Sequence, residues 1–316
     1  MPAFRNSQAL HWNSALQHWE PIALDECSWS LHDAGALYGA MVVERFRTLG
    51  GSFFDLQDRW ERFSLGLQVL DVGFELSQPN FEEAFLRLLE LNRDLIAVAG
   101  DVSLVAVASP GEVRGDESSP TVVLHISPLS WTRLASWYRF GTPLFLSSYS
   151  AVPDTCWPTQ LKTRSRLPYY LSELELAKKQ RKSQERMPIE ALPLLKTIHG
   201  SIADTALANI VIVDKHGVVR APAIDSALEG CSLKLATRLL RRIEIELIRS
   251  DVTLLDLHEA REVWLTGSSG CIWRASSLDG RELGTDKAFT LFGQLKAEWI
   301  RHVGHDFERQ AIQQIA

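Results

Sequence analysis

The chain has 316 residues, of which 46% are hydrophobic and 23% are charged. This is the composition of a globular protein rather than of a disordered or membrane-spanning chain. The formal net charge of −6 comes with no long basic run, so the positive field that nucleic-acid binding requires is missing and we expect no nucleic-acid partner. Because 316 residues exceed one ordinary core, two domains are expected.

Targeting and metal-binding signals are not found in the sequence. Residues 1–21 lack the apolar core of a secretory signal, and nowhere do about 18 apolar residues run together, so we expect a cytoplasmic protein with no membrane segment. The four cysteines are widely spaced and form no CxxC pair, which predicts free thiols and no metal site. They are Cys27, Cys156, Cys231 and Cys271.

The first half of the chain begins with a predicted hairpin. The β-branched run at 40–48 and the segment 52–56 flank Gly50 and Gly51, a spacing typical of two strands joined by a glycine turn. Residues 56–70 place apolar side chains at helical intervals. A helix is also expected at 79–94, with strands at 102–109 and 121–129.

The second half alternates short strands with helices. Strands are predicted at 142–150, 209–214, 218–222 and 262–269, and helices at 170–187, 233–248 and 288–303. This alternation predicts two mixed α/β domains, at 1–135 and 136–316, rather than one regular parallel sheet. Rossmann and P-loop nucleotide folds lose support because the chain has no GxGxxG or GxxxxGK[ST] loop.

One lysine lies in an unusual cationic setting. Lys162 has Arg164 and Arg166 within five residues, and a partly buried lysine in such company would have a lowered pKa and could act as a nucleophile. The alternative interpretation is that Lys162, Arg164 and Arg166 form an ordinary basic patch on the surface. Arg62, on the helix predicted at 56–70, is a further candidate cation for the site. An arginine that is solvated or paired with a charge on its own helix would explain this residue equally well.

Asp204 and two small polar turns complete the candidates. Asp204 lies among small and apolar residues, where a carboxylate needs a cation such as a protonated pyridine nitrogen, although capping a turn explains it equally. The turn 230–232 precedes a predicted helix, and the turn 266–270 follows a predicted strand. A helix N-terminus with a hydroxyl suits a phosphate, but each turn alone is also a routine cap.

Taken in order, these stretches resemble the class IV PLP-dependent family, which includes branched-chain aminotransferases, D-amino-acid aminotransferases and aminodeoxychorismate lyases. The resemblance covers about 32–284 and rests on six motifs. They are Asp33-x-Gly35-x-x-Tyr38-Gly39 with Glu44 and Arg47, Arg59-x-x-Arg62-Phe63, Lys162-x-x-Ser165-x-Leu167, Ile202-x-Asp204-x-x-x-x-Asn209-Ile210, Gly230-Cys231-Ser232, and Glu262-Val263-Trp264-Leu265-Thr266-Gly267-Ser268.

The resemblance implies a two-domain class IV (fold-type IV) architecture, with the active site at the domain interface, pyridoxal 5'-phosphate (PLP) as cofactor, and a homodimer. Lys162, the catalytic residue, would bind the cofactor as a Schiff base and shuttle the substrate's proton. Arg62 would bind the phosphate, helped by Cys231, Ser232 and Ser268. Asp204 would pair with the ring nitrogen in place of the family's usual glutamate.

The substrate side departs from the family pattern. Ser165 replaces a common asparagine, and Pro110 stands where several relatives have a carboxylate-binding arginine. Arg166 occupies a position that is tyrosine in branched-chain enzymes, which tilts the prediction away from branched-chain substrates. The candidate substrate residues are Tyr38, Arg114, Arg164, Arg166 and Ser269.

Three functions follow from the resemblance. The first is an aminotransferase acting on a small-molecule amino acid and a 2-oxo acid. The second is a lyase that releases pyruvate, as aminodeoxychorismate lyase does, and Arg166 favours it. The third is a catalytically inert binding module, which Pro110, Ser165 and Asp204 would fit.

Overall fold

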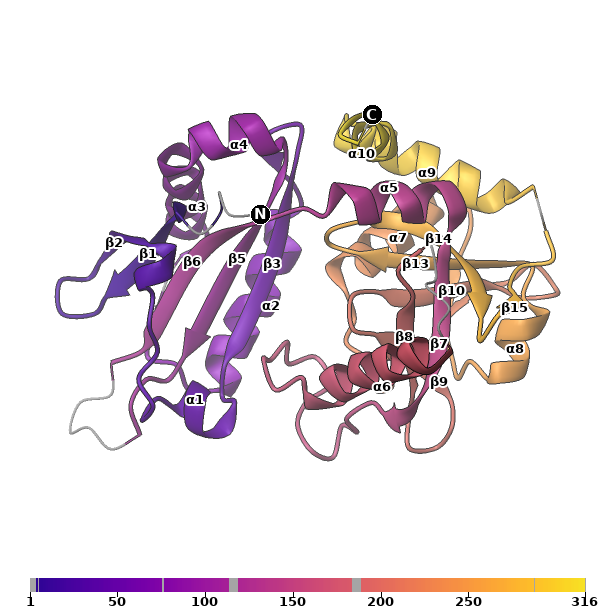
Figure 1. The fold of residues 1–316 in the computed structure, drawn as a ribbon, viewed down its shortest axis with the longest axis horizontal. Coiled ribbons are helices and arrows are strands. Elements are labelled where there is room, and N and C mark those ends of the chain that lie inside the picture. The colour runs from indigo at the N-terminus through magenta and orange to yellow at the C-terminus, as the bar shows by residue number, and fades with distance from the viewer. Residues whose placement is uncertain are drawn as a thin grey trace. The chain divides into compact units, whose positions relative to one another are not determined.

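The computed structural model describes residues 4, 6–75, 77–113, 119–183, 189–286 and 288–315. The chain forms two compact units, which Figure 1 draws. The first unit is Met1–Leu129 with Leu161–Ser165, and the second is Ser130–Gln160 with Arg166–Ala316. The domain boundary expected between residues 135 and 136 stays a prediction.

The first unit is built on an antiparallel sheet. Within the described residues it has six strands in the order β2-β1-β6-β5-β3-β4. The strands are β1 (Gln8–Asn13), β2 (His18–Ala23), β3 (Val42–Leu49), β4 (Ser52–Phe53), β5 (Val102–Ser109) and β6 (Thr121–Pro128). The helices are α1 (Ala34–Tyr38), α2 (Leu56–Val69), α3 (Gln78–Leu91) and α4 (Arg93–Ala99).

Helices α2 and α3 pack on the core side of this sheet (Figure 1). Side chains alternate along β3, so Val42 and Phe46 enter the core with Phe63 of α2 and Phe81 of α3. The predicted glycine-turn hairpin is confirmed by the pairing of Thr48 with Phe53 and of Leu49 with Ser52. The amphipathic helix predicted at 56–70 is confirmed as α2.

The second unit holds a mixed sheet. Its described residues form nine strands, of which eight run in the order β12-β11-β10-β13-β14-β7-β8-β9, with β15 beside β14. The strands are β7 (Thr142–Ser150), β8 (Leu192–Lys196), β9 (Ile202–Thr205), β10 (Asn209–Val213), β11 (Val219–Ala221), β12 (Leu247–Arg249), β13 (Glu262–Gly267), β14 (Cys271–Leu278) and β15 (Arg281–Glu282). Because β9 also pairs with β10, the strands from β10 to β9 close into a ring.

The helices of the second unit are α5 (Trp131–Phe140), α6 (Leu167–Ser183), α7 (Cys231–Arg242), α8 (Leu254–Glu259), α9 (Thr290–Val303) and α10 (Phe307–Gln313). The predicted helix at 170–187 begins three residues earlier than expected, and its residues 184–187 lie outside the described part of the chain. The last predicted helix is confirmed as α9.

The predicted helix at 233–248 is wrong at its C-terminal end. Helix α7 ends at Arg242, and Leu247–Arg249 form a strand that pairs in parallel with β11. Glu244 takes a left-handed backbone conformation with φ of 61°, which no helix interior accommodates. The apolar residues after it therefore follow a strand pattern, with Leu247 buried and Ile248 exposed.

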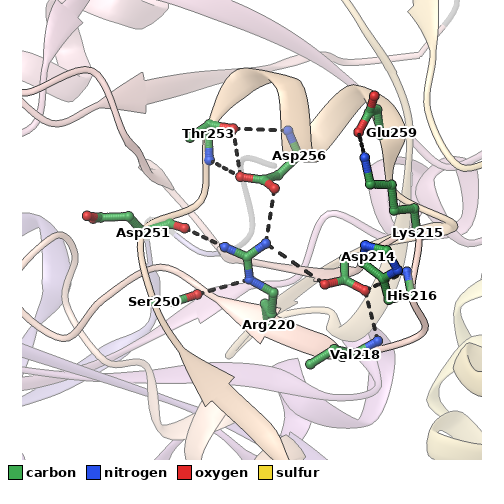
Figure 2. A network of polar contacts seen from close by, with 10 residues as sticks. All are labelled: Asp214, Lys215, His216, Val218, Arg220, Ser250, Asp251, Thr253, Asp256 and Glu259. Atoms are coloured by element: carbon green, nitrogen blue, oxygen red, sulfur yellow. Dashed lines mark hydrogen bonds and ion pairs between the residues drawn. The ribbon is translucent and has the colours of Figure 1, made fainter.

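A polar network on the second unit fixes the segment between β12 and α8 (Figure 2). Arg220 of β11 donates from Nε to Ser250 at 3.0 Å, from Nη1 to Asp256 at 3.0 Å and from Nη2 to the Asp251 carbonyl at 2.7 Å. Thr253 and Asp256 form a capping box at the start of α8. This arginine therefore joins the sheet to the helix through hydrogen bonds that satisfy its three nitrogens.

None of the helices in the described part of the chain has both the length and the apolar character that crossing a lipid bilayer requires.

Candidate active site

The backbone around Lys162 is bound to the start of β3 in the first unit. Val43 donates to the Lys162 carbonyl at 2.9 Å, and Arg164 donates to the Met41 carbonyl at 2.8 Å. Thr163 forms an antiparallel bridge with Val42. Within the described residues β4 pairs with the far end of β3, so the Lys162 segment extends the sheet at this end and its backbone position is set by sheet hydrogen bonds.

Hydroxyl groups fasten the same segment to the loop after α1. Thr163 Oγ1 donates to the Met41 carbonyl at 3.0 Å, and Ser165 Oγ donates to the Gly39 carbonyl at 2.8 Å. Gly39 has φ of 68°, and a Cβ there would come within 2.4 Å of Ser165 Oγ. The loop must therefore have glycine at this position. Tyr38, immediately before it, is 70% exposed.

A buried carboxylate anchors α1 from the other side. Asp33 Oδ1 accepts from the Gly35 backbone at 2.6 Å and caps the helix. Its Oδ2 accepts from Ser109 at 2.9 Å and from Thr121 at 2.7 Å. Because these hydroxyls belong to β5 and β6, the loop that contacts the Lys162 segment is tied to the centre of the sheet.

Glu44 of β3 and Arg62 of α2 form a buried ion pair. Glu44 is 0% exposed and lies on the core face of its strand, and Arg62 Nε reaches its Oε2 at 2.8 Å. Burial alone would raise the pKa of Glu44, but the charge and hydrogen bonds of Arg62, with the charge of Lys162 behind them, hold it below its ordinary value. Glu44 is therefore an anion, and it fixes the orientation of Arg62.

In the second unit, Asp204 of β9 is held by a tyrosine. Asp204 is 6% exposed, and the Tyr169 hydroxyl donates to its Oδ1 at 2.8 Å. The guanidinium of Arg166 lies over the Tyr169 ring, 4.5 Å from its centre, and donates to the Ala206 carbonyl. Burial, followed by the charge of Asp204, raises the pKa of Tyr169 well above its ordinary value, so its hydroxyl remains a donor at neutral pH.

Asn209 links three parts of the candidate site. At the start of β10 it pairs with Asp204 on one side and with Thr266 on the other. Its side-chain Oδ1 accepts from the Gly230 backbone at 2.9 Å, and a Cβ on Gly230 would come within 2.3 Å of that oxygen. The position of Asp204, the start of α7 and the end of β13 therefore all depend on Asn209.

The start of α7 and the turn after β13 have the features of a phosphate site. Helix α7 begins at Cys231, and its N-cap, Gly230, has no side chain to satisfy the first backbone N–H groups. Cys231 and Ser232 are buried, and Thr266 Oγ1 is buried with no hydrogen-bond partner among the described residues. Ser268 follows in the turn between β13 and β14. These groups fit a phosphate, and buried Asp204 fits a protonated ring nitrogen.

The structure distributes the residues predicted from sequence over the two units. The first unit contains Tyr38, Arg62, Lys162 and Arg164, and the second contains Arg166, Asp204, Cys231, Ser232, Ser268 and Ser269. Arg114 lies outside the described residues. The sequence reading did not assign roles to Glu44, Tyr169 or Asn209. For Tyr169 a signal existed, because Tyr169, Ser172 and Leu176 recur at helical spacing on the packed face of α6.

Comparison with known proteins gives the family. The model of the family described as amino-transferase class IV matches residues 41–278. This span covers most of the chain and includes Glu44, Arg62, Lys162, Asp204 and Ser232. The chain belongs to the class IV aminotransferase family, and the resemblance inferred from its motifs is confirmed.

Curated relatives and solved structures agree with this assignment. A putative branched-chain-amino-acid aminotransferase of Methanocaldococcus jannaschii is 24% identical over 274 residues, which cover 85% of this chain and 89% of that protein. A probable branched-chain-amino-acid aminotransferase of Thermotoga maritima is 24% identical over 82% of each chain. The branched-chain amino acid aminotransferase of Thermobaculum terrenum in its PLP form superposes with a TM-score of 0.77 at 17% identity, over 98% of each chain.

The protein is thus a PLP-dependent aminotransferase with the mixed α/β fold expected from its sequence. Its substrates are small amino and 2-oxo acids. In the structure Asp204, Cys231 and Ser232 are buried.

Proposed function

We propose that Lys162 is the catalytic lysine of this aminotransferase, which binds the cofactor covalently and moves the substrate's proton. The observation that supports it is the backbone pairing of Lys162 with Val43 of β3, one residue before Glu44. This pairing fixes the start of the side chain, while the Glu44 anion stabilises nearby positive charge. A lysine fixed in this way can deliver or remove a proton at a defined carbon atom.

Bound PLP withdraws electrons from the substrate's α-carbon, and the protein's task is to hold and orient it. For its phosphate we propose Arg62, the backbone N–H groups of Cys231 and Ser232, and the hydroxyls of Ser232 and Ser268. Helix α7 favours an anion at its N-terminus, and its Gly230 N-cap has no side chain that could bind the first backbone N–H groups instead. For the ring nitrogen we propose Asp204, whose burial makes pairing with a cation favourable.

On the substrate side we propose Tyr38, Arg164 and Ser269 as contacts, with Arg164 binding a carboxylate. Arg166, which the sequence also suggested as a substrate contact, is engaged with Tyr169 and Ala206 in the structure, so we favour Arg164 for this role. Two relatives carry branched-chain names, so valine, leucine and isoleucine are the first amino donors to test. Arg166 stands where branched-chain enzymes have tyrosine, so glutamate and D-alanine belong in the same panel.

The test is spectroscopic. Wild-type protein loaded with PLP should absorb near the edge of the visible range, and Lys162→Ala should abolish this band. Lys178→Ala, which removes an exposed lysine of α6, is the control and should keep it. An amino donor from the panel should then convert the band to that of the pyridoxamine form. A band that survives Lys162→Ala would contradict the assignment of the lysine.

Two alternatives have their own outcomes in this experiment. Pyruvate release from aminodeoxychorismate without any 2-oxo acid would support the lyase, which Arg166 in Lys162-x-x-x-Arg166-Leu167 favours. Protein that stays colourless after addition of PLP would support an inert binding module. We also propose a cytoplasmic homodimer, which sedimentation velocity and fractionation would check.

A further inference from the structure

The first turn of α6 is attached to the β9–β10 hairpin at two points. Tyr169 donates to Asp204 at the end of β9, and Arg166 donates to Ala206 in the hairpin loop. The loop itself is closed by Thr205, whose backbone N–H and Oγ1 both reach the Ala208 carbonyl, at 3.0 and 3.1 Å. Both attachments therefore end on a rigid element.

Asp204 needs such support because a strand fixes only its backbone. Pairing with Asn209 sets the Cα of Asp204, but two side-chain torsions remain to orient the carboxylate. A hydrogen bond at 2.8 Å from Tyr169 to Oδ1 removes that freedom. Aspartate is one methylene shorter than the family's usual glutamate, so its charged group has less reach and its direction matters more.

Tyr169 is itself held in place. Arg166 covers its ring, and the ring packs against the cluster of Ala151, Leu195 and Ala203. Since burial and the nearby Asp204 charge raise its pKa, Tyr169 remains protonated across the neutral range and its hydroxyl keeps donating. The phenol is therefore a fixed neutral donor to a fixed carboxylate oxygen.

We infer that Tyr169 is a positioning residue for the cofactor's ring nitrogen, acting through Asp204, and that Arg166 in turn fixes Tyr169. The inference rests on the proposed pairing of Asp204 with that nitrogen. It assigns Arg166 to the cofactor side of the site, and it assigns Tyr169 a role that its neighbour Tyr170, 61% exposed, does not share.

The test compares two cofactors in two matched variants. Dissociation constants are measured for PLP and for 1-deazapyridoxal 5'-phosphate, in which carbon replaces the ring nitrogen, in wild type, Tyr169→Phe and Tyr170→Phe. Losing a hydrogen bond to a charged group should weaken PLP binding in Tyr169→Phe about tenfold. The deaza analogue has no nitrogen for Asp204 to pair with, so its affinity should change less than about twofold.

A second readout needs no cofactor. Melting temperatures of the cofactor-free wild type, Tyr169→Phe, Asp204→Ala and the double variant form a cycle. If the two side chains interact, the loss in the double variant should be smaller than the sum of the single losses by about 2 °C. Additive losses would show that the contact contributes nothing.

Each failure points to a different idea. Equal weakening of both cofactors in Tyr169→Phe, or the same effect in Tyr170→Phe, would overturn the positioning role while the Lys162-dependent colour persists. An absence of that colour in wild type would instead overturn the proposed function, and the melting cycle would still decide whether Tyr169 and Asp204 interact.

Discussion

Arg62 of α2 and Glu44 of β3 meet in a bidentate pair. Arg62 Nε donates to Glu44 Oε2 and Nη2 donates to Oε1, both at 2.8 Å. Glu44 is 0% exposed and Arg62 is 7% exposed, so bulk water cannot replace either residue as the partner of the other's charge. Each therefore depends on the other, and the pair fixes the guanidinium that we propose for the cofactor phosphate.

Glu44→Gln should strongly destabilise the cofactor-free protein. The substitution leaves the Arg62 cation buried without its anion, which costs about 3 kcal/mol in the free energy of unfolding. Urea denaturation followed by circular dichroism measures it. Glu61→Gln, at an exposed position of α2, the helix that carries Arg62, is the control and should cost less than about 0.5 kcal/mol. Equal effects of the two changes would contradict the importance of the buried pair.

The same pair predicts a pH dependence with a defined sign. The pKa of Glu44 is lowered in the folded protein from an ordinary value of 4.5. Its contribution to stability is therefore fully present above about pH 4.5 and is lost as the pH falls through the folded value. Unfolding free energies measured between pH 6 and pH 3 should fall more steeply in wild type than in Glu44→Gln. Parallel curves would show that Glu44 does not contribute to acid unfolding.

Local patterns in the sequence were sufficient for part of the fold. The glycine turn at 50–51 and the apolar spacing of α2 and α9 are local signals, and the structure follows them. Strand β14 was missed although β13, one of its partners, ends four residues before it, because its other partner, β7, lies more than a hundred residues away in the sequence. The helix predicted past Arg242 failed because the left-handed turn at Glu244 is formed by a residue that gives no glycine-like signal.

Some residues of the candidate site could be predicted from the sequence, and others could not. Lys162, Arg62, Asp204 and Ser232 could be proposed from sequence because their order along the chain matches a family, not because their local surroundings were distinctive. Partners that meet only through folding could not be found. Tyr169 reaches Asp204 across 35 positions, and Tyr170 beside it is chemically identical. The helical spacing of Tyr169 with Ser172 indicates which tyrosine faces inward, but nothing local indicates that its partner is Asp204.

Ser232→Ala should weaken the binding of PLP but not the binding of pyridoxal, which has no phosphate. If the hydroxyl donates to the phosphate, its removal should weaken PLP binding about tenfold. Pyridoxal, which lacks the phosphate, should bind wild type and variant equally. Fluorescence titration of the tryptophans gives both constants. A parallel loss for pyridoxal would place Ser232 elsewhere in the site.

Arg220→Met should lower the stability of the second unit against unfolding without changing cofactor binding. The substitution removes the hydrogen bonds to Ser250, Asp251 and Asp256 (Figure 2) and leaves Asp256 Oδ1 without its arginine, at a cost of about 2 kcal/mol. Arg241→Gln, at an exposed position of α7, serves as the control. Thermal unfolding measures the loss, and the Lys162-dependent absorbance should remain. Unchanged stability would show that the network is only a surface arrangement.

Thr266→Val should stabilise the cofactor-free protein. Thr266 Oγ1 is buried and, within the described residues, has no hydrogen-bond partner. Replacing it with a methyl group of similar shape removes a desolvated polar group and should raise the unfolding free energy by about 1 kcal/mol. Thr205→Val is the matched control and should destabilise, because Thr205 Oγ1 accepts from Ala208 at 2.9 Å.

The cofactor should stabilise the Thr266→Val variant less than it stabilises wild type. Thr266 directly precedes the Gly267-Ser268 turn proposed for the phosphate, and its hydroxyl has no hydrogen-bond partner within the described residues, so we propose that it donates to the bound anion. The increase in melting temperature that saturating PLP produces should therefore be smaller in Thr266→Val than in wild type. A variant that is less stable without the cofactor would show that the hydroxyl already has a partner, such as an ordered water molecule, in the folded protein.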